Sequence, residues 1–164
     1  VAYPTESCFG LGCDPKNRNG INKIIRIKKR SRNKNFILIG SSIKQFNFFI
    51  KPINKLSKKN LFLKWPGPHT WLLNTNNRCP SWLKNDNKIA LRISSFHNCY
   101  ELAKSIDMAI TSTSLNLSGK ISLKNFRDVC RFLPNQVKLI PGKIGKNKNP
   151  STIQDLETKK IIRA

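Results

Sequence analysis

Short apolar runs of strand length alternate with segments of helical periodicity along this chain. Phe36–Ile39 is a continuous apolar run closed by Gly40, and Ile89–Ile93 has the two-residue period of a strand. Asn17–Lys29 and Leu123–Leu133 instead repeat their apolar residues at helical spacing. This alternation predicts an α/β fold, in which a single domain holds a mixed sheet flanked by helices.

Weaker signals, bounded by Gly, Pro and Asn, place the remaining elements. Further strands are expected at Val1–Tyr3, Thr70–Leu73, Met108–Ile110, Val137–Ile140, Thr152–Ile153 and Lys160–Ile162. Further helices are expected at Ser41–Ile50, Leu56–Lys64 and His97–Ile106. The polar stretch Asn74–Asn87 is predicted to be a loop.

The length of 164 residues suits one domain, residues 1–164. Because the chain opens on Val1 without an initiating methionine, we expect a segment that precedes Tyr3 to be missing. Lysine, proline or asparagine interrupts every apolar stretch well before the ~20 residues that a membrane helix needs. We therefore expect no membrane association.

The formal net charge of +23 has two explanations that the sequence leaves open. A lysine-rich surface binds phosphate backbones, so a contact with tRNA or other RNA is one of them. The chain is also rich in Asn and Ile, which share AT-rich codons with Lys, so codon bias is the other.

The five cysteines are odd in number and contain no C-x-x-C pair. This pattern favours free thiols in a reducing cytosol over a disulfide framework or a zinc site. We therefore expect a cytoplasmic protein that has no metal cage of its own.

Lys28 stands where the apolar stripe of the first helix, Ile21, Ile24 and Ile25, would continue. One interpretation is a cation that favours the helix C-terminus and extends its ammonium to solvent. The other is a cation that points inward to a ligand. Arg30 can converge with Lys28 only if the helix ends between them, and the turn-forming residues Ser31, Asn33 and Asn35 favour such an end.

The run Ser112–Gly119 places four hydroxyls, one amide and a glycine directly after an expected strand. Such residues build caps and turns through local bonds, which is the structural interpretation. Ligands of α/β sheets bind where strands end, and phosphates need hydroxyl and backbone donors, which is the functional one. Neither a Walker A loop nor a complete G-x-G-x-x-G pattern is present.

Arg92 lies among apolar residues of an expected strand, so its guanidinium needs an anionic partner. Either a local Asp or Glu or the carboxylate of a substrate could supply it. Thr5, just after Pro4, could present its hydroxyl to the same cavity.

Several motifs occur together in the order of one family. They are Tyr3-Pro4-Thr5-Glu6, Gly10-Leu11-Gly12-Cys13-Asp14-Pro15, Lys28-Lys29-Arg30, Trp65-Pro66-Gly67-Pro68-His69-Thr70, Leu91-Arg92-Ile93, Ser112 to Gly119, and Pro150-Ser151-Thr152-Ile153. The chain resembles the YrdC-like family, in its short bacterial TsaC form, over nearly its whole length.

The resemblance implies a twisted α/β fold with a basic cavity. It also implies a reaction in which ATP, bicarbonate and L-threonine give threonylcarbamoyl-AMP and pyrophosphate, for N6-threonylcarbamoyladenosine at tRNA position 37. Mg²⁺ would arrive on the ATP phosphates, and TsaD-, TsaB- and TsaE-type proteins would complete the modification. The alternatives are a non-catalytic RNA-binding relative and a carbamoyl-adenylate-forming relative of the hydrogenase-maturation type.

The resemblance also implies roles for single residues. Lys28, Arg30, Ser114 and Asn116 would hold the ATP phosphates, and Arg163 would contact the nucleotide. Thr5 and Arg92 would bind threonine, and Thr70 and Ser151 would contact threonine or nucleotide. No acid or base is assigned.

The chain departs from the family pattern at three positions in or near these motifs. Ser31 replaces a usual proline, Asn35 a usual glycine and Leu115 a usual alanine. Leu115 is expected to bring a bulkier side chain to the phosphate site.

Overall fold

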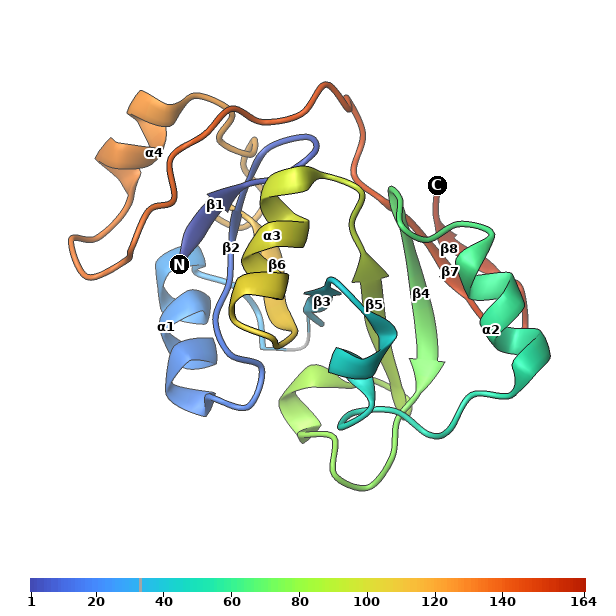
Figure 1. Ribbon diagram of the computed structural model, residues 1–164. Coiled ribbons are helices and arrows are strands. Elements are labelled where there is room, and N and C mark those ends of the chain that lie inside the picture. The colour runs from blue at the N-terminus through green and yellow to red at the C-terminus, as the bar shows by residue number, and fades with distance from the viewer. Residues whose placement is uncertain (33) are drawn as a thin grey trace.

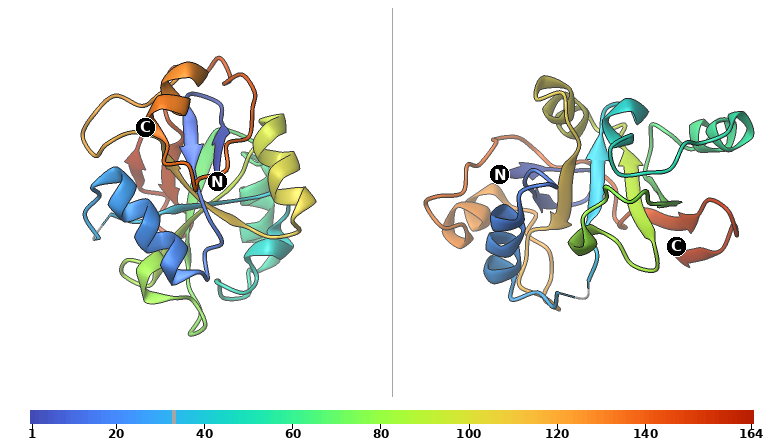
Figure 2. Two further views of the ribbon diagram at one scale, coloured as in Figure 1. Left: turned by 90° about the vertical axis from the view of Figure 1, so that its left-hand side faces the viewer. Right: turned by 90° about the horizontal axis from the view of Figure 1, so that it is seen from below.

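The computed structural model describes residues 1–32 and 34–164, and these form one twisted sheet flanked by helices (Figures 1 and 2). The strands are β1 (Ala2–Pro4), β2 (Phe9–Leu11), β3 (Ile37–Gly40), β4 (His69–Asn74), β5 (Lys88–Ile93), β6 (Ile110–Ser114), β7 (Thr152–Asp155) and β8 (Ile161–Arg163). The α-helices are α1 (Arg18–Lys28), α2 (Lys55–Phe62), α3 (His97–Ser105) and α4 (Phe126–Phe132), with 3₁₀ turns η1 (Ile43–Phe46) and η2 (Ser81–Leu83).

The strand order is β1-β2-β6-β3-β5-β4-β7-β8. The pairs β3–β5 and β4–β7 are parallel and the other neighbours are antiparallel, so the predicted mixed sheet is confirmed. β3 lies between β5 and β6, opposite Arg92 at Ile39 and opposite Ser112 at Ile37. Strands from distant parts of the sequence thus bring candidate residues together.

The first helix ends where the sequence predicted. The Asn17 side chain caps its start by accepting from the backbone N–H of Gly20, and Ile21 and Ile24 are buried. Lys29 adopts a left-handed conformation with φ 47°, which stops the helix. Arg30 therefore leaves the helical path, although Asn33 of the predicted turn lies outside the described residues.

Two clusters of buried apolar residues support the sheet. The larger one joins α1, β2, β3, β4 and β5 and includes Leu115, which is fully buried. The smaller one is made by Tyr3, Ile39, Cys99 and Ile110, where α3 packs against β1 and β3. In Figure 2, α1 and α4 lie toward one end of the sheet and α2 lies toward the other.

Several elements differ from the sequence prediction. The helix expected at Ser41–Ile50 is reduced to the 3₁₀ turn η1, and the expected loop Asn74–Asn87 contains the turn η2. β6 runs from Ile110 into the hydroxyl run as far as Ser114, because β2 and β3 both pair with it. The last predicted helix begins only at Phe126, where Asn125 provides the N-cap. The expected strand Val137–Ile140 is reduced to one bridge between Leu139 and Ala2.

In the described part of the chain, no helix is long and apolar enough to cross a membrane.

Candidate functional site

A cavity of about 450 Å³ lies between the ends of several strands and the loops that follow them. β3, β5, β6, β7 and β8 each contribute to its wall, with the loops after β1, α1, β6 and α4 (Figure 1). Its lining consists of Ser7, Cys8, Arg30, Asn35, Ile37, Arg92, Ser112, Thr113, Ser114, Ser122, Lys124, Lys148, Pro150, Ser151, Ile153 and Arg163. Five of the residues that we predicted for the site are in this lining.

The C-terminus of α1 and the hydroxyl run meet directly. The ammonium of Lys28 donates to the backbone oxygens of Ser114 and Asn116 and to the Asn116 side-chain oxygen, 2.8 Å away. These three acceptors match the three N–H groups of a charged lysine. Lys28 is only 1% exposed, so its primary contact is the loop and it lies behind the cavity wall.

Asn116 completes this connection. Its side-chain oxygen also accepts from the hydroxyl of Ser114 at 2.7 Å, and its side-chain nitrogen donates to the backbone oxygen of Lys120. The β6 end and the following turn are therefore bound to one cation. Ser114 stays in the cavity lining, so its position depends on Lys28 and Asn116.

Arg30 is the cation that α1 delivers to the cavity itself. Its guanidinium donates to the backbone oxygen of Asn35 at 2.7 Å, and it lies over the Phe36 ring with 5.1 Å to the centroid. Because these contacts come from its own loop, Arg30 is held while facing the cavity. Asn35, where the family usually has glycine, lines the cavity beside it.

Arg92 finds a local acid as its partner. One of its terminal nitrogens, Nη2, donates to the carboxylate of Glu6, and Nε donates to the backbone oxygen of Gly67 at 3.0 Å. The alternative that a local Asp or Glu pairs with Arg92 is thus confirmed for the free protein. The substrate alternative also stands, because Arg92 lines the cavity.

A second group of candidates lies at β4, β7 and β8. The hydroxyls of Thr70 and Ser151 are 2.8 Å apart, and the guanidinium of Arg163 donates to the backbone oxygen of Ser151. Ser151 and Arg163 line the cavity, whereas Thr70 is fully buried behind Ser151. Thr70 is therefore placed to fix Ser151 rather than to reach a ligand first.

Thr5 lies beside the cavity without lining it. Its hydroxyl donates to the backbone oxygen of Cys8 at 2.7 Å, which closes the turn between β1 and β2. Cys8 and Ser7 of that turn do line the cavity. The Thr5 hydroxyl would have to leave this bond to donate to a substrate.

Leu115 does not obstruct the site. Its side chain is fully buried in the larger core cluster, so it points away from the cavity, between Ser114 and Asn116. Leu115 lies just after the end of β6 at Ser114 and packs among the residues of the larger core cluster. The expectation that Leu115 would crowd the phosphates is wrong.

The cavity is strongly cationic. Arg30, Arg92, Lys124, Lys148 and Arg163 line it, and within the described residues no carboxylate does. Burial lowers the pKa of the Arg30 and Arg163 guanidinium groups, and the charge of Arg92 lowers that of Arg163 further. Charges that repel one another in a partly dry hollow favour an anionic ligand.

Several lining residues were not singled out from the sequence. Lys124 and Lys148 come from loops that only the fold brings together, and Ser7, Cys8 and Ser122 join them. Among the 31 lysines and arginines of the chain, these two lysines carry no distinguishing signal. Their only mark in the sequence was proximity to the hydroxyl run and to Pro150-Ser151.

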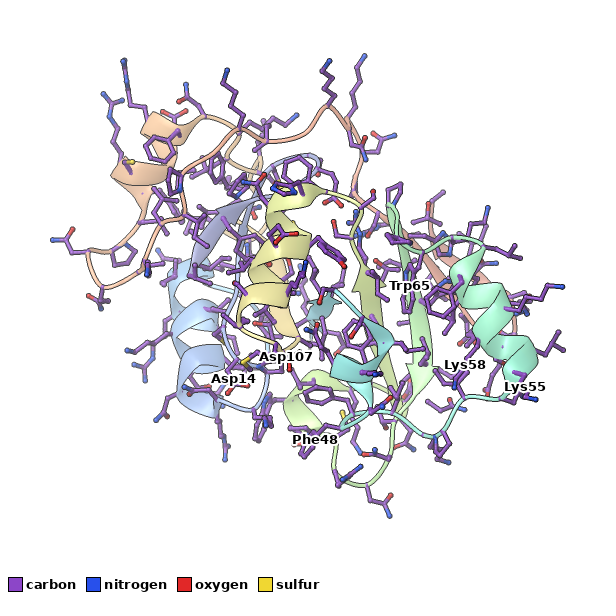
Figure 3. The ribbon with its side chains drawn as sticks, in the orientation of Figure 1. Asp14, Phe48, Lys55, Lys58, Trp65 and Asp107 are labelled. Atoms are coloured by element: carbon purple, nitrogen blue, oxygen red, sulfur yellow. The ribbon has the colours of Figure 1, made fainter. Side chains whose placement is uncertain are left out.

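A larger hollow of about 880 Å³ is separate from this cavity. It lies between η1, the start of α2 and the loop after β4, where Figure 3 labels Lys58. The two hollows share no lining residue in the described ranges, and the larger one contains none of the predicted site residues.

Lys28 makes the stability of the fold depend on pH. Burial, with a smaller effect of nearby Arg30, lowers its pKa from 10.5 to about 8. Between these values the unfolded chain binds more protons than the folded one, so this group makes stability rise with pH by at most about 1.4 kcal/mol per unit. The free energy of unfolding of the wild type, minus that of Lys28→Met, should therefore increase from pH 8 to about 10 in urea titrations. A difference that stays constant over this range would contradict the burial of the charge.

Comparisons with known proteins identify the family of this chain. The model of the Sua5/YciO/YrdC family, described as telomere recombination, matches residues 1–164. The chain belongs to this family. A threonylcarbamoyl-AMP synthase of Methylobacillus flagellatus is 41% identical over 164 residues, covering 99% of this chain and 91% of that protein. One of Wigglesworthia glossinidia brevipalpis is 43% identical, covering 99% and 86%.

A solved structure shows the same fold with a ligand. The crystal structure of P. abyssi Sua5 complexed with L-threonine has a TM-score of 0.85 and 26% identity to this chain. The match covers 96% of this chain and 47% of the Sua5 chain, so this chain spans about half the length of that protein. The α/β class and the resemblance to the YrdC-like family are thereby confirmed.

Proposed function

We propose that the protein is an L-threonylcarbamoyladenylate synthase. The observation that carries this proposal is the cationic cavity in which Arg30 and the Ser114 loop face residues of β5, β7 and β8. Close relatives with this name cover nearly the whole chain. The cavity thus offers separate groups of donors for a polyphosphate and for a carboxylate.

The chemistry joins three substrates in two steps. The amine of threonine attacks bicarbonate and forms a carbamate with loss of water. A carbamate oxygen then attacks the α-phosphorus of ATP, and the bond to the β-phosphate oxygen breaks, which releases pyrophosphate. The chain contributes positioning and charge neutralisation, the two effects that dominate transfer at phosphorus.

Single residues take roles that follow from their contacts. Arg30 and Ser114 would bind the ATP phosphates, with Lys28 and Asn116 holding the Ser114 loop in place. Arg92 would bind the threonine carboxylate, because planar guanidinium and carboxylate groups pair through two hydrogen bonds. Ser151, supported by Thr70, and Arg163 would contact threonine or nucleotide, and Thr5 would present its hydroxyl from the β1–β2 turn.

Mg²⁺ would enter this site on the ATP phosphates. No group of three or more His, Cys, Asp or Glu in the described ranges could hold a metal ion, and the cavity wall offers hydroxyls and cations. Such a wall fits an ion that keeps its waters and is carried by substrate phosphates. When bound, Mg²⁺ would neutralise part of the phosphate charge.

The proposal includes a place in the cell and partners. Threonylcarbamoyl-AMP is a mixed anhydride, so an acceptor must take its threonylcarbamoyl group, and we propose that TsaD-, TsaB- and TsaE-type proteins transfer it to adenosine 37 of tRNA. An enzyme that supplies tRNA modification would work in the cytoplasm.

The direct test uses the purified protein with ATP, Mg²⁺ and bicarbonate. Pyrophosphate should be released only when L-threonine is added, and the nucleotide product should have the mass of threonylcarbamoyl-AMP. Serine at the same concentration is the matched control, since it lacks only the methyl group. Pyrophosphate release that does not depend on threonine would contradict the proposal.

Replacing Arg30 with alanine should weaken ATP binding by about 1.5–3 kcal/mol, because one charge-assisted hydrogen bond to phosphate is lost. Calorimetric titration with a non-hydrolysable ATP analogue measures this loss. Lys23→Ala removes one cation from the exposed side of α1 and serves as the control. Equal affinities of the Arg30→Ala and Lys23→Ala proteins would remove Arg30 from the phosphate site.

A further inference from the structure

Glu6 is a buried carboxylate in a chain that has only eight acidic residues against 31 lysines and arginines. Its exposure is 7%, and it does not belong to the residues that line the cavity. Its carboxylate accepts from Nη2 of Arg92 and from the hydroxyl of Ser94. Glu6 therefore lies directly behind the guanidinium that faces the cavity.

The contacts of Arg92 fix which of its N–H groups remain for a ligand. Nε donates to the backbone oxygen of Gly67, and Nη2 donates to Glu6. Within the described residues, Nη1 makes no hydrogen bond. A guanidinium carries five N–H groups in a rigid plane, so two held groups leave three, two on Nη1 and one on Nη2. One N–H from each of these nitrogens can form the outer pair that meets a carboxylate.

Glu6 is itself held by both neighbouring parts of the fold. The Ser94 hydroxyl that donates to it also accepts from the backbone N–H of Phe96 at 3.0 Å, at the start of α3. On the other side, the backbone oxygen of Glu6 accepts from Asn147, and that of Thr5 accepts from Gly145. A Cβ at residue 145 would come within 2.6 Å of the Glu6 oxygen, so only glycine allows this approach.

The same loop leads into the cavity wall. The chain from residue 134 to 150 crosses one end of the sheet between α4 and β7 (Figure 1). After its bonds to Thr5 and Glu6 it continues to Lys148, Pro150 and Ser151, which line the cavity. Glu6 therefore connects the loop that leads to β7 with the Arg92 guanidinium on β5.

We propose that Glu6 is a positioning residue, which holds Arg92 so that its outer N–H pair meets the carboxylate of the amino acid substrate. This inference rests on the proposed function, since it concerns threonine at the same site. Glu6 keeps the charge of Arg92 compensated while the cavity is empty. It also leaves the two N–H groups that a bidentate carboxylate needs.

A purely structural ion pair would behave differently. Buried pairs contribute little net stability, and losing one partner disturbs the whole fold. A structural role would therefore lower the affinity for both substrates together with the melting temperature. A positioning role changes the affinity for threonine and leaves ATP, which Arg30 and the Ser114 loop hold, unaffected.

The experiment compares Glu6→Ala, which removes charge and acceptor, with Glu6→Gln, which keeps an acceptor oxygen at the same place. Asp128→Asn, on the exposed side of α4, removes one carboxylate as the matched control. Calorimetry with L-threonine and, separately, with a non-hydrolysable ATP analogue gives both dissociation constants. We expect Glu6→Ala to raise the threonine constant at least about tenfold and the ATP constant less than about twofold, because misplacing one group affects only its own ligand. Glu6→Gln should recover part of the loss.

Equal losses for the two ligands, or an unchanged threonine constant in Glu6→Ala, would overturn the proposal. A readout without ligand separates it from the proposed function, namely the solvent exchange, measured by NMR, of the Arg92 Nη2–H proton that donates to Glu6. This proton should exchange slowly in the wild type and in Asp128→Asn and rapidly in Glu6→Ala. If the wild type binds no threonine while this exchange pattern holds, the proposed function fails and the holding of Arg92 by Glu6 stands.

Discussion

Replacing Arg92 with alanine is expected to lower threonine-dependent pyrophosphate release at saturating ATP by a factor of roughly 30 to several thousand. Truncating one partner of a buried, hydrogen-bonded charge pair costs about 2–5 kcal/mol, and each 1.4 kcal/mol is about a factor of ten. The loss should appear in the KM for threonine, since the phosphate side of the cavity is built by Arg30 and the Ser114 loop.

This variant also leaves the Glu6 carboxylate buried without its cation, so its stability must be measured alongside its activity. Arg92→Lys is the companion variant, because it keeps the charge opposite Glu6 but loses the planar fork that pairs with a carboxylate. We expect Arg92→Lys to melt close to the wild type and still to show a raised KM for threonine. A KM that rises for ATP instead would assign Arg92 to the nucleotide.

Lys28→Met should reduce activity by about a hundredfold or more without removing any group from the cavity lining. The methionine fills the same volume, but the Ser114 and Asn116 oxygens lose the cation that fixes them, and displacements near 1 Å cost about that much in rate. Stability should fall by only about 1–3 kcal/mol, the cost of leaving buried acceptors unpaired. Steady-state kinetics and urea unfolding measure the two effects.

Lys29→Met is the control for this experiment, because Lys29 is the exposed neighbour at the same helix end. Its activity should stay close to that of the wild type. If Lys28→Met kept normal activity, the connection between α1 and the hydroxyl run would have no role in catalysis. If Lys28→Met lost activity only because part of the protein unfolds, its folded fraction would show the wild-type structure of the Ser114 loop by crystallography or NMR.

The sequence predicted the elements whose patterns are local. The apolar run before Gly40 and the stripe of Ile21 and Ile24 place β3 and α1 nearly residue by residue. Val137–Ile140 shows the limit of such patterns, because an apolar run becomes a strand only where a neighbour offers backbone partners along its length. Here Ala2 offers one bridge.

The candidate site was predicted in its residues more fully than in its connections. The family resemblance located Arg30, Arg92, Ser114, Ser151 and Arg163, and all five line the cavity. The sequence could not show that Lys28 donates its three hydrogen bonds to the hydroxyl run. Nor could it show that Glu6 pairs with Arg92, which is 86 positions away. Such pairings depend on strand order and on which side chains face one another, and one sequence carries no local signal for either.

The position of Arg163 on β8 has a consequence for synthesis of the chain on the ribosome. β8 pairs with β7, and Arg163 donates to Ser151, so one wall of the cavity is made by residues that are translated after Arg30, Arg92 and Ser114. When only residues 1–140 have left the ribosome, the nascent chain contains Arg30 and Arg92 but lacks this wall. A complete cavity for nucleotide and amino acid can therefore form only after β8 has been translated, and a chain without β8 is not expected to make the adenylate.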